Sequence, residues 1–267
     1  MRKNPSKSIS TRLNNATAIL VLIFMLIPII MIMVSAFNDS EFFRFPPTGF
    51  TLKWIKKFFT NPEYSTAIQV SLRVSFAALC VALLVGIPAA YGIFKWKSKI
   101  SIFLQTIFLS PLMLPGIVWA IGLIQYYAIL GVLGTFYGLV AAHIILILPY
   151  VIRLLLSSLT YLDEDLENAA MTLGATPVRT FFLITIPSVV PGIIISAIFG
   201  FMISFNDVTI STFIAGTKYL TYPVRMYVEL RTEGLDPLAI AVSAIIMLVT
   251  TIIALIAEKI WNWSQYL

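Results

Sequence analysis

Long runs of apolar residues recur along this sequence, and they constrain the fold more than any other feature. Each run reaches the roughly 20 residues that a helix needs to cross the hydrocarbon core of a bilayer. Inside that core every backbone polar group must be bonded within the protein, so only helices or closed barrels can span it. The runs are continuous rather than alternating, which excludes a barrel. The sequence therefore predicts an all-α membrane protein with six transmembrane helices, at 16–37, 66–94, 100–130, 136–159, 186–205 and 237–257.

The scarcity of charge supports this class of protein. Of the 267 residues, 59% are hydrophobic and only 11% are charged. A soluble domain of this length would need a polar surface that so few charges cannot supply. The net charge of +6 does not indicate nucleic-acid binding, because the basic residues lie in short segments between the apolar runs. Cys80 lies inside one of these runs, so we interpret this single cysteine as a small buried hydrophobe.

Lysine and arginine predict the orientation of the helices. Arg2, Lys3, Lys7 and Arg12 precede the first run, and the turn from Lys95 to Lys99 has three lysines and no acid. Because such residues concentrate in cytoplasmic loops, we expect both termini in the cytoplasm. The first run is longer than the apolar part of a signal peptide, which favours an uncleaved anchor. The expected segments are a cytoplasmic tail (1–15), a scaffold helix (16–37), an extracytoplasmic segment (38–65) and a core of five transmembrane helices (66–262).

One loop between two apolar runs, residues 161–185, has the features of two short helices joined by a sharp bend. Asp163 is a suitable N-cap for the first helix, and Gly174 follows at the position of a left-handed C-terminal cap. Thr176 and Pro177 can then cap and begin the second helix. The small side chains of Ala169 and Ala170 would let the first helix lie closely in a groove of a partner. The alternative is an amphipathic surface loop with no partner.

The run AAMTLGATPVRTFFLITIP in this loop resembles the EAA loop of ABC-importer permeases. Asn168 stands at the family's glutamate position and Glu167 one residue earlier, so the two side chains differ by about 100° around the helix. The residues that the resemblance implies for coupling to the ATPase are Glu167, Asn168, Ala169, Ala170, Gly174, Ala175 and Pro187, and Phe181 or Phe182 and Ile184 match the same motif.

This resemblance implies the type I permease fold in a bacterial cytoplasmic membrane. The implied partners are two ATP-binding subunits, a second related permease and an extracytoplasmic binding protein. ATP and Mg²⁺ would then be bound by the ATP-binding subunit, and this chain would hold no cofactor. Further segments, including SPLMLPGIVWAIGL and SFNDVTISTFIAG, look like the spermidine/putrescine branch of the family. Similar patterns occur in permeases for ferric iron, phosphonates and opines, so the cargo stays open at this point.

Polar residues within the apolar runs are candidates for a transport path, because burying them in a bilayer is costly. Ser204, Asn206 and Asp207 lie at the outer end of the fifth run. They either line the path or bond at a helix end. We expect His143 to make a hydrogen bond between helices rather than to bind a metal. Arg73 either reaches the membrane interface or pairs with an acid, such as Glu63. Kinks are expected at Pro111, Pro115, Pro149 and Pro191.

Several other functions are disfavoured by what the sequence lacks. It has no GxxxxGK[ST] loop, so ATP binding by this chain is not expected. An ion-coupled secondary transporter predicts inverted repeats and ionisable residues near the bilayer centre, and neither is evident. An intramembrane enzyme predicts a cluster of catalytic groups within the spans, which is also not found. A purely structural membrane subunit would have no need of an EAA-like loop.

Overall fold

The computed structural model describes residues 5–96 and 98–261, with side chains for 14–96 and 98–259. Within these residues the regular structure is helical, and the extended pairing is limited to an isolated bridge between Asn38 and Phe50. The chain forms two compact units, Met1–Pro62 with Glu229–Ile252, and Glu63–Val228 with Ile253–Leu267. The basic tail residues Arg2 and Lys3 and the turn residue Lys97 lie outside the described residues.

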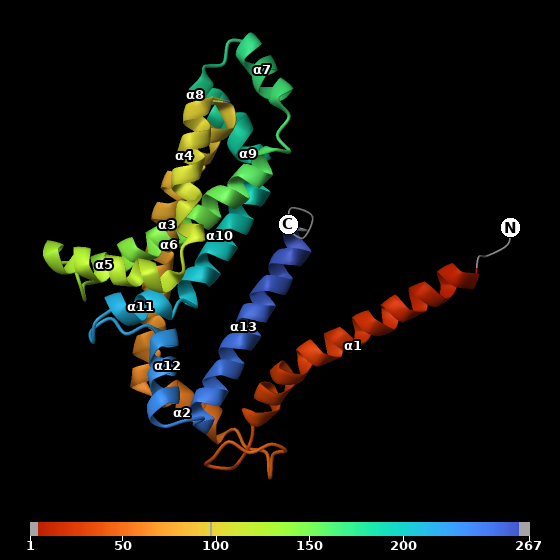
Figure 1. The fold of residues 1–267 in the computed structure, drawn as a ribbon, viewed down its shortest axis with the longest axis vertical. Coiled ribbons are helices and arrows are strands. Elements are labelled where there is room, and N and C mark those ends of the chain that lie inside the picture. The colour runs from red at the N-terminus through yellow and green to blue at the C-terminus, as the bar shows by residue number, and fades with distance from the viewer. Residues whose placement is uncertain (1–4, 97, 262–267) are drawn as a thin grey trace. The chain divides into compact units, whose positions relative to one another are not determined.

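The elements follow the expected order. In the ribbon of Figure 1 they are α1 (Pro5–Ser35), α2 (Lys53–Thr60), α3 (Pro62–Lys95), α4 (Lys99–Leu109), η1 (Ser110–Met113), α5 (Gly116–Leu130), α6 (Phe136–Leu159), α7 (Glu164–Thr172), α8 (Pro177–Thr180), η2 (Phe181–Thr185), α9 (Ile186–Ser188), α10 (Val190–Phe205), α11 (Thr209–Ile214), α12 (Tyr222–Thr232) and α13 (Pro237–Trp261).

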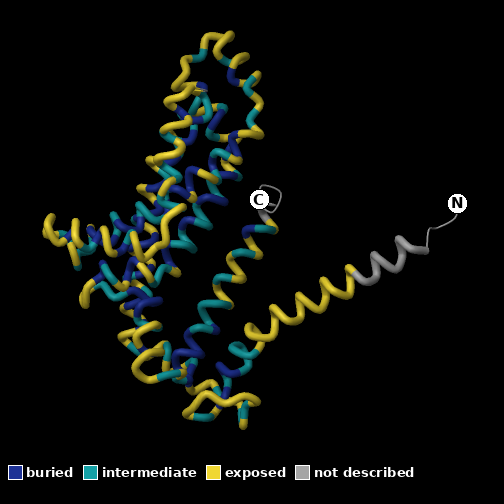
Figure 2. Tube along the Cα trace, in the orientation of Figure 1, coloured by how far each residue is buried: buried dark blue, intermediate teal, exposed yellow. Residues whose placement is uncertain are grey.

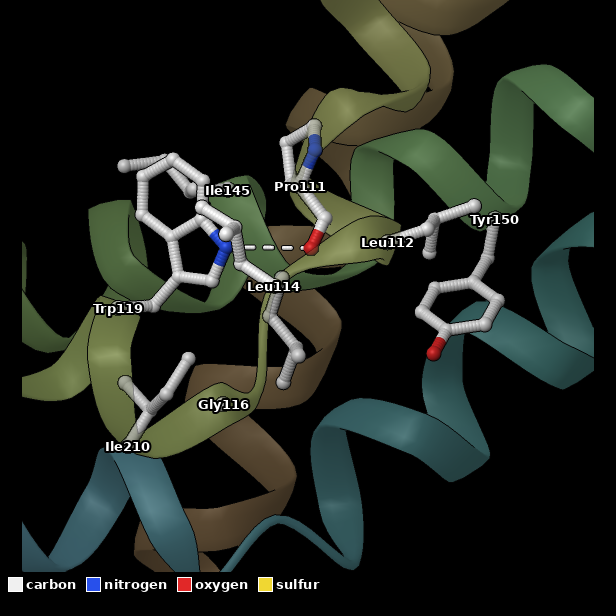
Figure 3. Close-up of a pocket in the computed structure, with 9 residues that line it drawn as sticks. Pro111, Leu112, Leu114, Gly116, Trp119, Ile145, Tyr150 and Ile210 are labelled. Carbon is white, nitrogen blue, oxygen red and sulfur yellow. Dashed lines mark hydrogen bonds between the residues drawn. The ribbon is translucent and has the colours of Figure 1, made fainter.

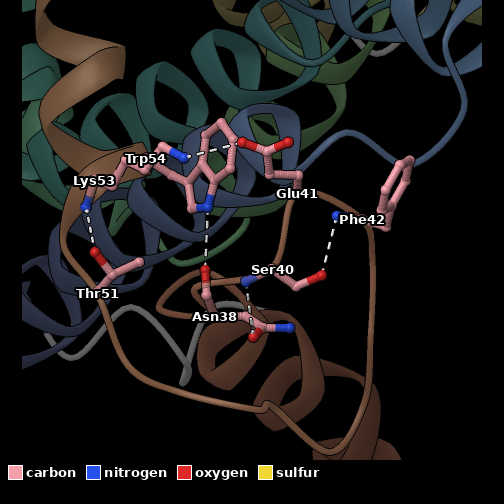
Figure 4. Close-up of polar contacts among 7 residues, drawn as sticks. All are labelled: Asn38, Ser40, Glu41, Phe42, Thr51, Lys53 and Trp54. Carbon is pink, nitrogen blue, oxygen red and sulfur yellow. Dashed lines mark hydrogen bonds and ion pairs between the residues drawn. The ribbon is translucent and has the colours of Figure 1, made fainter.

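In the first unit, helix α1 leaves its apolar side chains uncovered. None of its most apolar window, within Asn14–Ser35, is buried, as the exposed tube in Figure 2 shows. Such a surface is suited to contact with lipid. The segment after α1 is held by Trp54 of α2, whose indole N–H donates to the Asn38 carbonyl at 3.1 Å (Figure 4). Lys53 and Lys57 lie over the indole ring, so the aromatic and basic residues of α2 form one packed cluster.

In the second unit, α6 is the central helix and packs closely on α10. Half of its most apolar window is buried. Glycine permits the close approach, because a Cβ at Gly192 of α10 would lie 2.2 Å from the Ser158 side chain of α6. Val151, Ile152 and Leu155 of α6 form the core of this unit, together with alanines of α3. The missing side chain at Gly192 therefore lets α10 lie directly against Ser158, and a larger residue would push the two helices apart.

Two of the expected spans are broken rather than straight. Run 100–130 consists of α4 with η1 and α5, and the axis bends by 101°, while Pro177–Ser188 and Val190–Phe205 meet at 69°. The described residues therefore contain four uninterrupted candidate spans, or six if each bent pair counts as one. The expected kinks at Pro111 and Pro115 lie at the first break, which is far sharper than a kink. Pro149, by contrast, lies within the continuous helix α6.

The break between α4 and α5 has a local chemical cause. Pro115 has no N–H to donate to the carbonyl of Pro111, four residues earlier. The indole N–H of Trp119 donates to that carbonyl instead, at 3.1 Å (Figure 3). A cavity of about 170 Å³ lies beside the break, with Tyr150 of α6 and Ile210 of α11 on its walls. A hydrogen bond from a side chain of the same apolar run therefore stabilises the bend.

Candidate functional site

The loop at 161–185 has the caps that the sequence predicts. The Asp163 carboxylate accepts the N–H of Asp165 at 3.0 Å and begins α7. Gly174 has φ of 90°, the left-handed conformation that ends the helix without steric cost. The Thr176 hydroxyl then accepts the N–H of Arg179 at 3.3 Å and begins α8, with Pro177 as the first helical residue. The prediction of two short helices at a bend is confirmed, and Figure 1 shows both at one end of the second unit.

One face of α7 carries exposed apolar and small side chains. Leu173 is 89% exposed and Leu166 51% exposed. Asn168 and Ala169 are exposed, whereas Ala170 is half-buried. Further along the loop, Ala175 is half-buried and Pro187 is exposed. An apolar face left in water is typical of a surface that a partner covers.

Glu167 lies on the opposite face of α7 and is fully buried. Its carboxylate accepts hydrogen bonds from Lys95 Nζ at 2.5 Å, from the Tyr91 hydroxyl at 3.2 Å and from the Thr185 hydroxyl. Lys95 also lies 3.7 Å from Glu164. The glutamate therefore joins α7 to the end of α3 and to η2. We call Glu167, Lys95, Tyr91 and Thr185 the Glu167 cluster.

The Glu167 cluster consists of contacts that the sequence did not predict, and a coupling role for Glu167 stays a prediction. The sequence grouped Glu167 with the residues that couple to an ATPase, but its side chain contacts the chain's own helices. Sequence reasoning missed the other three members, and it used Lys95 only as an indicator of orientation. The 100° separation from Asn168 indicated only that the two side chains point in different directions, and it gave no signal for the three distant partners.

The electrostatics of the cluster favour an ionised glutamate. Burial raises the pKa of Glu167, but hydrogen bonds from Lys95 and Thr185 and the positive charge of Lys95 lower it more, so the pKa lies below its ordinary value. A buried carboxylate is tolerated here because it is paired and accepts three hydrogen bonds.

A π-turn brings Thr185 to the cluster. In η2 the N–H of Ile186 bonds to the carbonyl of Phe181, five residues earlier. The Phe181 ring also packs on Tyr91, with ring centroids 4.8 Å apart. The extra residue of a π-turn shifts the residues after it around the helix axis and so changes where their side chains point. Such turns are frequent at functional sites.

The candidate path residues are placed by a second polar network. Nδ1 of the buried His143 lies 2.7 Å from the Ser204 hydroxyl and Nε2 lies 2.9 Å from that of Ser211. Ser211 in turn donates to Asp207 at 3.0 Å. The expected hydrogen bond between helices at His143 is confirmed. Asp207 is half-buried at the start of α11.

Asn206 and Arg73 are the two remaining polar candidates from the sequence. Asn206 is exposed and donates to the Met202 carbonyl at 2.9 Å. Arg73 is exposed on α3. Glu63, which the sequence offered as its partner, pairs with Arg225 of α12 instead. Ser204 and Asp207 therefore meet through His143 and Ser211, whereas Asn206 stands apart from that network.

Comparisons with known proteins agree with this arrangement. Residues 82–261 match the model of the binding-protein-dependent transport system inner membrane component family. The chain belongs to this family. It is a permease subunit of an ABC importer and an integral protein of the inner membrane. Family membership excludes the secondary transporter and the intramembrane enzyme that the sequence had disfavoured.

Individual relatives cover nearly the whole permease. The chain is 30% identical to the spermidine/putrescine transport system permease protein PotC of Escherichia coli K12, covering 89% of each chain. It is 27% identical to PotC of Haemophilus influenzae, covering 95% of this chain and 98% of that protein. A bacterial alginate ABC transporter, solved in complex with an alginate-bound periplasmic protein, has the same fold, with a TM-score of 0.71, 20% identity, and coverage of 96% of this permease and 94% of that chain.

Proposed function

We propose that this permease forms half of the translocation path of a polyamine importer, and that loop 161–185 transmits ATP-driven motion to it. The observation that carries the proposal is the two-faced helix α7. Its apolar face, with Leu166, Ala169 and Leu173, is open to a partner. Its other face is tied to α3 and η2 through Glu167. A helix that is bonded to the spans on one side and exposed on the other is suited to transmitting a movement of the partner to the transmembrane helices.

The partners that we infer follow from the family. Two ATP-binding subunits bind ATP and Mg²⁺, hydrolyse the nucleotide and contact the loop at Asn168, Ala170, Gly174 and Ala175. A second, related permease completes the path, and a periplasmic binding protein delivers the cargo. The relative solved with a periplasmic protein supports the last of these. In this arrangement both termini and the loop lie in the cytoplasm, and the permease itself has no enzymatic step.

We infer an alternating-access mechanism, in which the translocation path changes between two states. Closure of the ATP-binding subunits moves α7, and the Glu167 cluster makes the ends of α3 and η2 follow. The breaks at 101° and 69° divide two spans into segments that can change their angle. A switch of this kind needs only a partner that binds one state better than the other.

A polyamine is the cargo that we infer, because the two PotC proteins named above are spermidine/putrescine permeases. Asp207 would supply the negative charge that an alkylammonium group requires, held by the N–H and hydroxyl groups of Ser211. Ser204 and Asn206 lie on the same stretch of chain and offer further oxygen acceptors.

Reconstituted uptake tests both parts of the proposal. Proteoliposomes containing the complete transporter and its binding protein should accumulate labelled spermidine or putrescine when ATP is supplied. The variant Gly174→Trp, which places a bulky side chain at a left-handed position, should insert normally but lose ATP-subunit binding and uptake. Accumulation of a phosphonate, an opine or iron in place of a polyamine would refute the cargo. Full subunit binding and uptake by Gly174→Trp would refute the docking.

A further inference from the structure

A buried imidazole connects helices α3, α6, α10 and α11 of the second unit. His143 of α6 is 1% exposed. On one side of its ring, Nδ1 lies 2.7 Å from the hydroxyl of Ser204 in α10, which in turn lies 3.1 Å from the hydroxyl of Ser75 in α3. On the other side, Nε2 lies 2.9 Å from the hydroxyl of Ser211 in α11. All three serines are buried as well, so hydrogen bonds on both sides fix the orientation of the ring.

The number of available protons gives the direction of the bond between His143 and Ser211. A serine hydroxyl has one proton to donate, and Ser211 donates it to Oδ2 of Asp207 at 3.0 Å. The hydroxyl has no second proton for the imidazole, so it must accept from the N–H at Nε2. This holds whether or not Nδ1 also carries a proton. His143 therefore keeps the hydroxyl proton of Ser211 directed at the Asp207 carboxylate.

The two carboxylate oxygens of Asp207 are bonded unequally. Oδ2 accepts both the hydroxyl of Ser211 and its backbone N–H, at 3.0 and 2.8 Å. Within the part of the chain that the structure describes, Oδ1 accepts the backbone N–H of Ile210 alone, at 3.4 Å, which is longer than an ordinary N–H···O bond. Asp207 is also only half-buried. Oδ2 therefore fixes the carboxylate, whereas Oδ1 keeps the capacity to accept from a further group.

We propose that His143 is a positioning residue for the cargo, which acts through Ser211 to hold the Asp207 carboxylate ready to accept an ammonium group at Oδ1. This inference rests on the proposed role of Asp207 as the negative charge that a polyamine requires, and it assigns that role a supporting group. A carboxylate that is already held in place loses less freedom when the cation arrives, so it binds more strongly. The alternative is a purely structural network, in which Asp207 serves only to cap α11.

The test measures uptake of labelled spermidine by proteoliposomes that contain the complete transporter, with saturating binding protein so that delivery does not limit the rate. In His143→Asn the short amide reaches only the position of Nδ1, and the donor to Ser211 is lost. In His143→Gln the longer side chain can bring an amide N–H to the position of Nε2. The asparagine variant should lower the uptake rate about tenfold, as expected for one lost hydrogen bond in a charged network, and the glutamine variant should stay within about threefold of the parent.

Two serine variants complete the test. Ser211→Ala keeps the imidazole but removes the hydroxyl between it and Asp207, so it should reproduce the loss of uptake in His143→Asn. Ser196→Ala is the matched control, because it removes another fully buried hydroxyl, one that donates to the Gly192 carbonyl of its own helix α10 at 2.7 Å. Its uptake rate should equal that of the parent.

The outcomes separate positioning from a structural role and from the cargo proposal. Both His143 variants remove the same buried ring, so their melting temperatures in detergent should fall together, and only uptake should distinguish them. Equal uptake by the two variants, or parent uptake by Ser211→Ala, would overturn the positioning role. Asp207→Asn keeps a side chain that can cap α11 but removes its charge. Low uptake by that variant would leave the cargo role intact when positioning fails, whereas parent uptake would overturn the cargo role of Asp207 and this inference with it.

Discussion

Replacing Glu167 with glutamine should uncouple ATP hydrolysis from transport, because it removes the charge that joins α7 to α3. The amide keeps an oxygen that can accept from Tyr91 and Thr185, so the substitution isolates the ion pair with Lys95. The Glu167 side chain is 1% exposed, whereas that of Lys95 is 29% exposed. The free-energy cost of the substitution therefore depends on the water and the other carboxylate that Lys95 can still contact.

The structure sets the size of this effect. Removing one partner of a fully buried ion pair costs about 3–5 kcal/mol. Lys95 keeps some access to water and a second carboxylate, that of Glu164, at 3.7 Å, so we expect about 1–2 kcal/mol. A loss of that size raises the population of detached α7 about 5- to 30-fold. Because detached α7 no longer moves the spans, uptake per ATP hydrolysed should fall.

Two measurements check this prediction. Amide hydrogen exchange should report faster opening of α7, and proteoliposomes should report the ratio of uptake to ATP hydrolysis. Glu164→Gln is the matched control, since it removes a carboxylate from the same helix near the same lysine but its side chain is 39% exposed. It should cost no more than about 0.5 kcal/mol. Exchange and coupling ratios in Glu167→Gln equal to those of the control would refute the reasoning.

Two further predictions follow from the same structure. Because the pKa of Glu167 is lower in the folded protein than its ordinary value, its stabilising contribution is complete above the ordinary carboxyl pKa and is lost as the pH falls through the lower value; a spin label at Ala169→Cys, introduced together with Cys80→Ser because Cys80 is itself exposed, should keep one mobility between about pH 8 and 6 and gain mobility only below the ordinary carboxyl pKa, and a change near neutral pH would contradict this. Gly192→Ala should lower the melting temperature in detergent, with a cost of about 1–3 kcal/mol from overpacking, because the added Cβ would lie 2.2 Å from Ser158; Gly122→Ala, which meets nothing within 4 Å, should not, and equal melting temperatures would show that α6 and α10 separate without cost.

Some features of this permease follow from the sequence alone because they depend on short stretches of chain. The apolar runs give the all-helical membrane class, since no other structure satisfies so much backbone in a bilayer. The caps at Asp163 and Thr176 and the left-handed Gly174 are local too, because each bond closes within four residues. The coupling-loop motif could likewise indicate the family, because all its residues lie in one short stretch of sequence.

Other features were decided only by the tertiary structure. Lys95 and Glu167 are 72 residues apart in sequence, and the hydroxyl of Ser204 is 61 residues from His143. Nothing in the local pattern predicts which distant groups will meet, because helix packing determines it. The 101° break likewise exceeds what Pro111 and Pro115 predict, since its angle depends on the Trp119 bond and the packing around it. The sequence therefore predicted a docking role for α7, and only the fold revealed which of its faces contacts the rest of the chain and which is exposed.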